Sequence, residues 1–296
     1  MLYLYGAIAA SLAMDVLIKM VSDSVHTWTM VALRWGVALL LLTPFAIRQF
    51  TAADWNPLRR VHFSRALLNV IGTFCLFHSL QTLQLPVVVT IFFAEPLFTT
   101  LFAVLLGRES VSWRGWIMTF VGFLGVVLVA IGDPNQHYEL GSVLNGHAAV
   151  AVAGAAAWGL MTVLTKRYGG AQSSLCLVFW LAVLTSLISL PIAGGEIFKV
   201  SPSDAALIAG AAALGSIYSI LWVAALKVMP ASLAATALYL TLPCSFIIGF
   251  VLFQEIPTGI SIVGGFIVFI GVVSLTNDRL RAVSTQAVIK IWRQFS

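Results

Sequence analysis

LQLPVVVTIFFAEPLFTTLFAVLLGRESVSWRGWIMTFVGFLGVVLVAIG (residues 83–132) decides the fold, because VMPASLAATALYLTLPCSFIIGFVLFQEIPTGISIVGGFIVFIGVV (residues 228–273) repeats it. Both stretches begin an apolar span with a proline, pass a glutamate and end in a glycine-rich apolar span. Pro86 and Pro230 are 144 positions apart, and Glu109 and Glu255 are 146 apart. Such a nearly constant offset indicates an internal duplication.

The duplication extends outward over almost the whole chain. Lys19 and Lys166 end the first span of each half, 147 positions apart, and Gly125 and Gly271 keep the 146 offset in the fifth spans. A helix that crosses the hydrocarbon needs about 20 apolar residues, and ten stretches are long enough, near 2–21, 28–49, 64–84, 86–107, 112–132, 147–168, 173–194, 203–227, 231–253 and 257–277.

Each half contributes five spans, an odd number, so the second half must enter the membrane from the opposite side. We therefore predict an all-α polytopic membrane protein of ten transmembrane helices in two inverted repeats. Inverted repeats are typical of secondary transporters, whose substrate site lies near the midplane between the halves. The predicted parts are a first repeat (1–132), an extracytoplasmic loop (133–146), a second repeat (147–277) and a basic cytoplasmic tail (278–296).

Composition and charge support this interpretation. The chain is 60% hydrophobic and only 9% charged, whereas about a quarter of a soluble domain is charged. Little sequence remains for an extramembrane catalytic or DNA-binding domain, and we expect no nucleic-acid partner. With ten spans, 13 of the 16 Lys and Arg residues fall on one side. The positive-inside rule then predicts that both termini are cytoplasmic.

At this level of detail the two quoted stretches resemble the drug/metabolite transporter superfamily, EamA type. The resemblance covers nearly all of residues 1–277 and rests on the proline that opens the fourth span, the glycine-rich last span, and the motif residues Glu95, Pro96, Gly107, Arg108 and Glu109. Pro243 stands in the second half in the role of Pro96. No glutamate stands there at the position of Glu95, so any role of that carboxylate is not duplicated.

Within this superfamily the chain most resembles bacterial exporters of aromatic amino acids and toxic organic compounds. The resemblance implies a multi-pass protein of the bacterial inner membrane that exports small organic solutes, namely aromatic amino acids or related metabolites and drugs, by alternating access. We expect a monomer without a cofactor, whose partners are a small-molecule substrate and the lipid bilayer. The exact substrate stays open, as does the choice between proton coupling and facilitated diffusion.

Ionisable side chains inside a membrane are costly and mark a transport pathway or a structural pair. Asp15, Arg34, His78 and Glu95 lie in the first four spans, in their middle or outward half. Two interpretations follow. Asp15 and Arg34 form a buried ion pair or take part in coupling, with Glu95 as an alternative partner of Arg34. Otherwise Glu95 receives the amino group of a zwitterionic substrate.

Aromatic residues extend this candidate site across the repeat. At the 144 offset, three residues of the first half correspond to three of the second, namely Phe74, His78 and Glu95 to Tyr218, Trp222 and Tyr239. The i, i+4 pairs Phe74/His78 and Tyr218/Trp222 each share one helix face. With Trp158 as a further contributor, these seven residues are our predicted substrate-binding set, suited to a flat or cationic solute. The alternative is packing or contact with lipid.

Pro96 and Pro243 are the predicted hinges, because proline bends a helix and frees carbonyl groups. An intramembrane enzyme is the main rival function, but the sequence has no HExxH, GxGD or GxSxG motif, so we predict no catalytic residue. Cys75, Cys176 and Cys244 fall inside spans without a CxxC pair, and we predict no metal site. A channel-like facilitator remains the other alternative.

Overall fold

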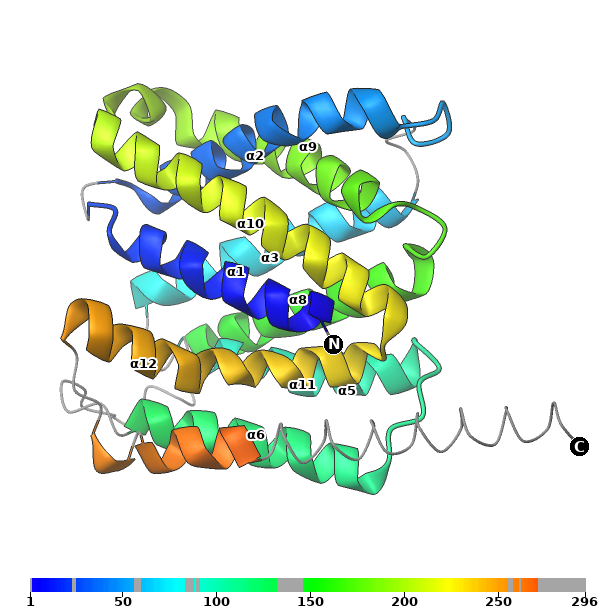
Figure 1. The fold of residues 1–296 in the computed structure, drawn as a ribbon, viewed down its shortest axis with the longest axis vertical. Coiled ribbons are helices and arrows are strands. Elements are labelled where there is room, and N and C mark those ends of the chain that lie inside the picture. Colours follow the sequence, from blue (N-terminus) through cyan, green and yellow to red (C-terminus); the bar gives the residue numbers. More distant parts are fainter. Residues whose placement is uncertain are drawn as a thin grey trace, which may run out of the picture.

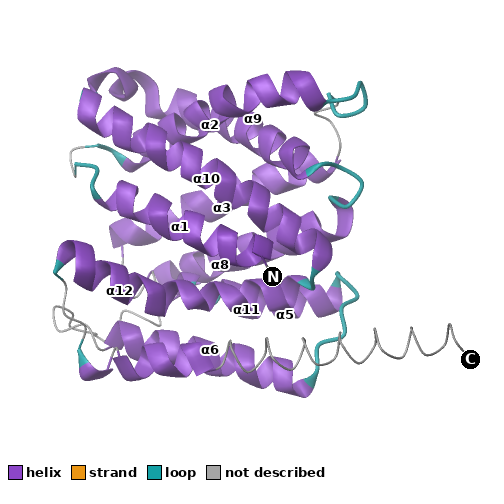
Figure 2. Cartoon of the chain, viewed as in Figure 1, coloured by secondary structure: helices purple, strands orange, loops and turns teal. Residues whose placement is uncertain are grey.

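The computed structural model describes residues 2–22, 25–55, 60–82, 88, 91–131, 146–254, 258–260 and 262–270, and the regular elements within these ranges are helices (Figures 1 and 2). The helices are α1 (Leu2–Lys19), α2 (Thr27–Gln49), α3 (Arg60–Thr82), α5 (Glu95–Leu105), α6 (Trp113–Ile131), α8 (Gly146–Tyr168), α9 (Ser174–Ala193), α10 (Pro202–Val228), α11 (Ala231–Ala237) and α12 (Thr241–Phe253), with 3-10 segments η1 (Gly194–Lys199) and η2 (Leu238–Leu240). Residues 262–270 form one more helical run.

Six segments of the described chain are long and apolar enough to cross a membrane, namely Leu2–Lys19, Thr27–Gln49, Ala148–Tyr168, Ser174–Lys199, Pro202–Val228 and Ala231–Leu252. Large apolar side chains cover the outer surface, among them Leu40 (72% exposed) and Phe250 (54% exposed). A soluble monomer rarely exposes so much contiguous apolar surface, so this surface suits contact with lipid. The predicted loop 133–146, except Gly146, and the tail 278–296 lie outside the described residues.

The helices pack mostly against partners far away in the sequence. α1 lies along α10, α3 lies along α8, and α2 lies along α9. α10 also packs against α2, and α5 packs against both α8 and α11. One apolar core therefore joins α1, α10 and the α11–α12 segment, and a second joins α2 and α9.

The fourth span of each half is interrupted near its middle. In the first half residues 91–92 are helical, Phe93 and Ala94 form a turn, and α5 begins at Glu95 with Pro96 in its first turn. In the second half α11 ends at Ala237, the 3-10 segment η2 follows, and α12 carries Pro243 in its first turn. Both predicted hinge prolines thus follow a break, although their role as hinges remains a prediction.

The two interrupted spans also end with the same turn. Arg108 (φ 56°) follows α5 and Gln254 (φ 57°) follows α12, and these are the non-glycine residues with positive φ in the described part of the chain. They are 146 positions apart. Positive φ is uncommon for such residues, so its occurrence at the same offset as the sequence repeat is a structural counterpart of that repeat.

The turn after α5 brings the carboxylate of Glu109 to the start of α11. Glu109 Oε1 accepts a hydrogen bond from the Ala231 N–H at 2.7 Å, and Oε2 accepts one from Ser232 Oγ at 3.0 Å. The first N–H groups of a helix lack partners within the helix and carry partial positive charge, so a carboxylate stabilises them. A motif of the first half thus caps a helix of the second half. We call this contact the Glu109 clamp.

Candidate transport site

The two helix breaks place Glu95 and Tyr239 in the interior of the protein. Glu95 Oε1 accepts a hydrogen bond from Thr162 Oγ1 on α8 at 3.5 Å, which is long for a bond between hydroxyl and carboxylate oxygens. Among the described residues no cation lies within 4.0 Å of the Glu95 carboxylate. Gly159 allows this approach of α8, because a Cβ there would lie 2.9 Å from the Thr99 nitrogen. Glu95 is therefore a carboxylate with a single weak partner.

Tyr239 lies in η2, at the second break, and is fully buried. Its ring rests on Gly122 of α6, where an added Cβ would lie 2.6 Å from the ring atom Cδ2. Its hydroxyl is buried without a hydrogen-bond partner among the described residues. A buried hydroxyl is costly unless it is hydrogen-bonded, and such a group marks a place for a water molecule or a ligand.

Arg34 extends from α2 across α10 toward α1. One guanidinium nitrogen donates to the sulfur of Met14 at 3.4 Å, and Cζ lies 4.9 Å from the ring centroid of Trp35. Within the described residues no ion pair of 4.0 Å or less joins Arg34 to Asp15 or Glu95. The direct ion pair that we considered is thus absent from this structure, in which the guanidinium contacts Met14, the neighbour of Asp15, instead. A coupling role of Asp15 and Arg34 stays a prediction.

Tyr218 on α10 lies near both groups of residues. It follows Gly215, which packs beside Met14 of α1 and Arg34 of α2, by three residues, and it packs against the core that contains Trp222 and Tyr239. Asp15, Arg34 and Glu95 each interact electrostatically with Tyr218. The described residues contain no group of three His, Cys, Asp or Glu side chains placed to hold a metal ion. What the region offers chemically is charge of both signs beside aromatic rings.

The two predicted aromatic pairs have the same geometry but different surroundings. The rings of Tyr218 and Trp222 stack at 6.3 Å and 23°, and those of Phe74 and His78 stack at 6.1 Å and 17°. Trp222 is 9% exposed and belongs to the core that contains Tyr239, whereas Phe74 is 57% exposed. The structure therefore joins the α10 pair to Tyr239 and leaves Phe74 on a surface.

Comparison with known proteins gives the family. The sequence profile of the EamA-like transporter family matches residues 1–131 and 147–277. The chain belongs to the EamA-like transporter family. The expectation drawn from the sequence motifs is confirmed, and the protein is a multi-pass membrane transporter.

Relatives of this EamA-like transporter include two proteins named S-adenosylmethionine uptake transporter. The one from Rickettsia prowazekii (strain Madrid E) is 24% identical over 272 residues, which cover 92% of this chain and 90% of the relative. The one from Rickettsia bellii (strain RML369-C) is 25% identical over 280 residues, covering 94% and 93%. A crystal structure at 15% identity superimposes with a TM-score of 0.80 over 94% of this chain and 97% of the other, which shows the same fold.

Trp158 of the EamA-like transporter lies beside this region and not within its charged part. Its Nε1 would be 2.4 Å from a Cβ added at Gly72 of α3, and its ring meets that of Phe92 edge-on at 5.1 Å. Trp158 thus packs between α3 and Phe92, which precedes the first break. This contact fits packing as well as substrate binding.

Four residues of the site were not predicted from the sequence. They are Met14, which contacts Arg34; Gly122, which contacts Tyr239; Thr162, which contacts Glu95; and Gly215, which packs against Met14 beside Arg34. Each contact joins helices from different parts of the chain, so local periodicity does not reveal it.

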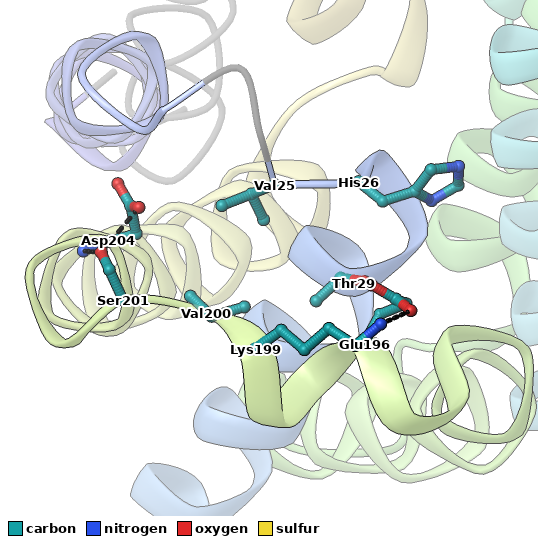
Figure 3. Close-up of a pocket in the computed structure, with 8 residues that line it drawn as sticks. All are labelled: Val25, His26, Thr29, Glu196, Lys199, Val200, Ser201 and Asp204. Atoms are coloured by element: carbon teal, nitrogen blue, oxygen red, sulfur yellow. Dashed lines mark hydrogen bonds and ion pairs between the residues drawn. The ribbon is translucent and has the colours of Figure 1, made fainter.

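A polar hollow lies at one end of the transporter, where α2 and α10 begin and η1 ends (Figure 3). Lys199 donates to Glu196 Oε1 at 2.6 Å, and Asp204 Oδ1 accepts from the Ser22 N–H at 3.0 Å. Asp204 and Tyr218 are 14 residues apart on α10, which corresponds to about 21 Å along the helix. The hollow is therefore distinct from the region around Tyr218.

Proposed function

We propose that this EamA-like transporter is a ten-span secondary transporter of two inverted repeats that works by alternating access. The helix pairs support this architecture, because the first helix of each half packs against the third helix of the other, α1 on α10 and α8 on α3. The two interrupted spans and the two positive-φ turns at the 146 offset support it as well. Discontinuous helices at corresponding positions of two halves are typical of transporter binding sites.

The proposed orientation has both termini in the cytoplasm of a bacterial cell whose inner membrane holds the protein. The distribution of basic residues supports this orientation. In that orientation the Glu109 clamp faces the cytoplasm and the polar hollow of Figure 3 faces outward.

We propose that the substrate is a small zwitterion of the amino-acid type that also carries a flat ring or a second positive charge. The observation that carries this proposal is the set of charged groups around Tyr218, namely Asp15, Arg34 and Glu95, none of which pairs directly with another. Charged groups inside a membrane protein normally pair with one another. A ligand with an ammonium and a carboxylate group would supply charged partners for these side chains.

Two substrates fit this description. Aromatic amino acids, the expectation from the sequence, bring a zwitterion and a ring. S-adenosylmethionine, the substrate in the names of the relatives, brings a carboxylate, an ammonium, a sulfonium and a flat adenine ring. The site holds two carboxyl groups and one guanidinium, and the second candidate has two cationic groups and one carboxylate to set against them. S-adenosylhomocysteine lacks only the methyl group and the sulfonium charge, and is therefore a zwitterion with no net charge.

Transport assays with the purified full chain in liposomes test this function. We expect saturable exchange of radiolabelled S-adenosylmethionine, which unlabelled S-adenosylhomocysteine should inhibit less strongly than unlabelled S-adenosylmethionine does. The exchange of tryptophan and of phenylalanine would be measured in the same way. Assays loaded from the inside and from the outside determine whether export or uptake occurs. Flux without saturation or exchange would indicate a channel-like facilitator, and chemical conversion of the solute would indicate an enzyme. Saturable exchange confined to solutes without a zwitterionic group would disprove the proposed substrate class.

A further inference from the structure

The guanidinium of Arg34 lies in the interior of the helix bundle, and among the described residues no carboxylate lies within 4.0 Å of it. Its five N–H donors form a planar fork that matches a carboxylate. In the described part of the chain its contacts are the sulfur of Met14 at 3.4 Å and the ring of Trp35 at 4.9 Å. A thioether is a weak acceptor, and an aromatic face stabilises a cation without neutralising it. Arg34 therefore makes no direct hydrogen bond to a carboxylate within the described residues.

Gly215 on α10 allows the Met14 thioether to pack closely beside this guanidinium. A Cβ at Gly215 would lie 2.9 Å from the Met14 sulfur and 4.0 Å from Arg34 Cζ. Any larger residue would push the thioether into the guanidinium or cover it. Tyr218 follows three residues later on the same face of α10, so Arg34 and Met14 lie near the stacked rings of Tyr218 and Trp222.

We infer that Arg34 binds the carboxylate of the transported solute and that the Met14 sulfur occupies the place of this carboxylate when no solute is bound. The inference rests on the proposed function and names the residue that selects for an acid group. The thioether donates no hydrogen bond and holds no charge, so an incoming carboxylate displaces it at small cost. Arg34 is then a determinant of specificity, and Glu95 remains available for the ammonium group.

Binding measurements on the full chain in lipid nanodiscs test the inference with two matched ligand pairs. The pairs are S-adenosylmethionine with its decarboxylated form and tryptophan with tryptophanamide. We expect the unaltered protein to bind the acid of at least one pair about tenfold or more tightly than its partner, as is typical of charge-assisted hydrogen bonds. Arg34→Gln should abolish this ratio while leaving the affinity for the ligand without the acid unchanged. Arg34→Lys should keep part of the ratio, because lysine retains the charge but not the fork.

The control variant is Arg48→Gln, because Arg48 lies on the same helix but is exposed in its last turn, and it should keep the full ratio. An equal loss for both members of a pair in Arg34→Gln, or an unchanged ratio, would overturn the inference while leaving the proposed function intact. If none of the four ligands binds to the unaltered protein, the proposed substrate class fails. Phenylglyoxal modification of Arg34 then decides the inference independently. We expect benzoate to slow the modification of Arg34 by phenylglyoxal and benzamide to leave its rate unchanged. Equal extents of modification in the presence of the two compounds would overturn the inference.

Discussion

At the scale of single residues, the site depends on groups that lack their usual partners. Glu95 has one long hydrogen bond, Arg34 contacts a thioether, and the Tyr239 hydroxyl has no partner in the described part of the chain. Unpaired polar groups inside a protein lower its free energy of unfolding. A structural role does not explain why the protein keeps them. Binding a solute of complementary charge does explain it.

Glu95→Gln tests the role of the carboxylate with almost no change of shape. We expect a folded protein that loses about tenfold or more in affinity for amine-bearing solutes, because a charged partner contributes about 1.5–3 kcal/mol to a hydrogen bond. Calorimetric or fluorescence titration of the purified variant measures this affinity. Since no ion pair joins Glu95 to Arg34, the double variant with Arg34→Gln should not recover stability. Unchanged binding in Glu95→Gln would remove this residue from the site.

Gly122→Ala tests the packing of the Tyr239 ring against α6. The added methyl group would lie 2.6 Å from Cδ2 of Tyr239, so we expect the free energy of unfolding to fall by about 1–3 kcal/mol, as for other overpacked cores, together with reduced transport. Gly36→Ala is the matched control, because Gly36 also lies inside a helix but has no atom within 4 Å of the added Cβ. Thermal unfolding in detergent compares the two. Equal melting temperatures would show that the ring moves aside without cost.

At the scale of the elements, the sequence predicted the helices well and their interruptions poorly. The expected span 28–49 corresponds to α2 (Thr27–Gln49), because hydropathy and length determine it. The expected spans 86–107 and 231–253 contain breaks that hydropathy does not show, since residues 91–94 and η2 are as apolar as their neighbours. Pro96 and Pro243 were the visible signals. Contacts such as Arg34 with Met14 depend on which helices become neighbours, and the local sequence does not encode that information directly.

Glu109→Ala tests the clamp at the start of α11. Without the carboxylate the N–H of Ala231 and the Ser232 hydroxyl lose their acceptor, and we expect a loss of about 0.5–2 kcal/mol in stability, as for other helix caps. Glu109→Gln should lose less, because an amide oxygen still accepts one hydrogen bond. The control is Glu196→Ala, since Glu196 makes an exposed ion pair with Lys199, and such pairs contribute little. The melting temperatures of the three variants decide between these outcomes, and an unchanged value for Glu109→Ala would contradict the capping role.

At the scale of the whole molecule, the proposed inverted topology makes opposite predictions for the two ends of the bundle. Lys199 in η1 should lie outside the cell and Arg114 in α6 inside, and both side chains are exposed. In intact cells, a membrane-impermeant maleimide should label Lys199→Cys and spare Arg114→Cys until the membrane is opened. Cys75 and Cys176 are buried and Cys244 is partly exposed, so the unaltered protein and the Cys244→Ser variant serve as background controls. Labelling of Arg114→Cys alone in intact cells would reverse the orientation.

The exchange of helices between halves has a consequence for biosynthesis. α1, α2 and α3 pack mainly against α10, α9 and α8, and Glu109 binds Ala231. The amino-terminal half therefore leaves the ribosome before its main packing partners have been made. Residues 1–145 made alone should therefore be degraded quickly, whereas the same fragment produced together with residues 146–296 should accumulate and transport. Each half thus supplies the helix surfaces on which the other half folds. After a gene duplication, selection would act on how well these two surfaces pack together.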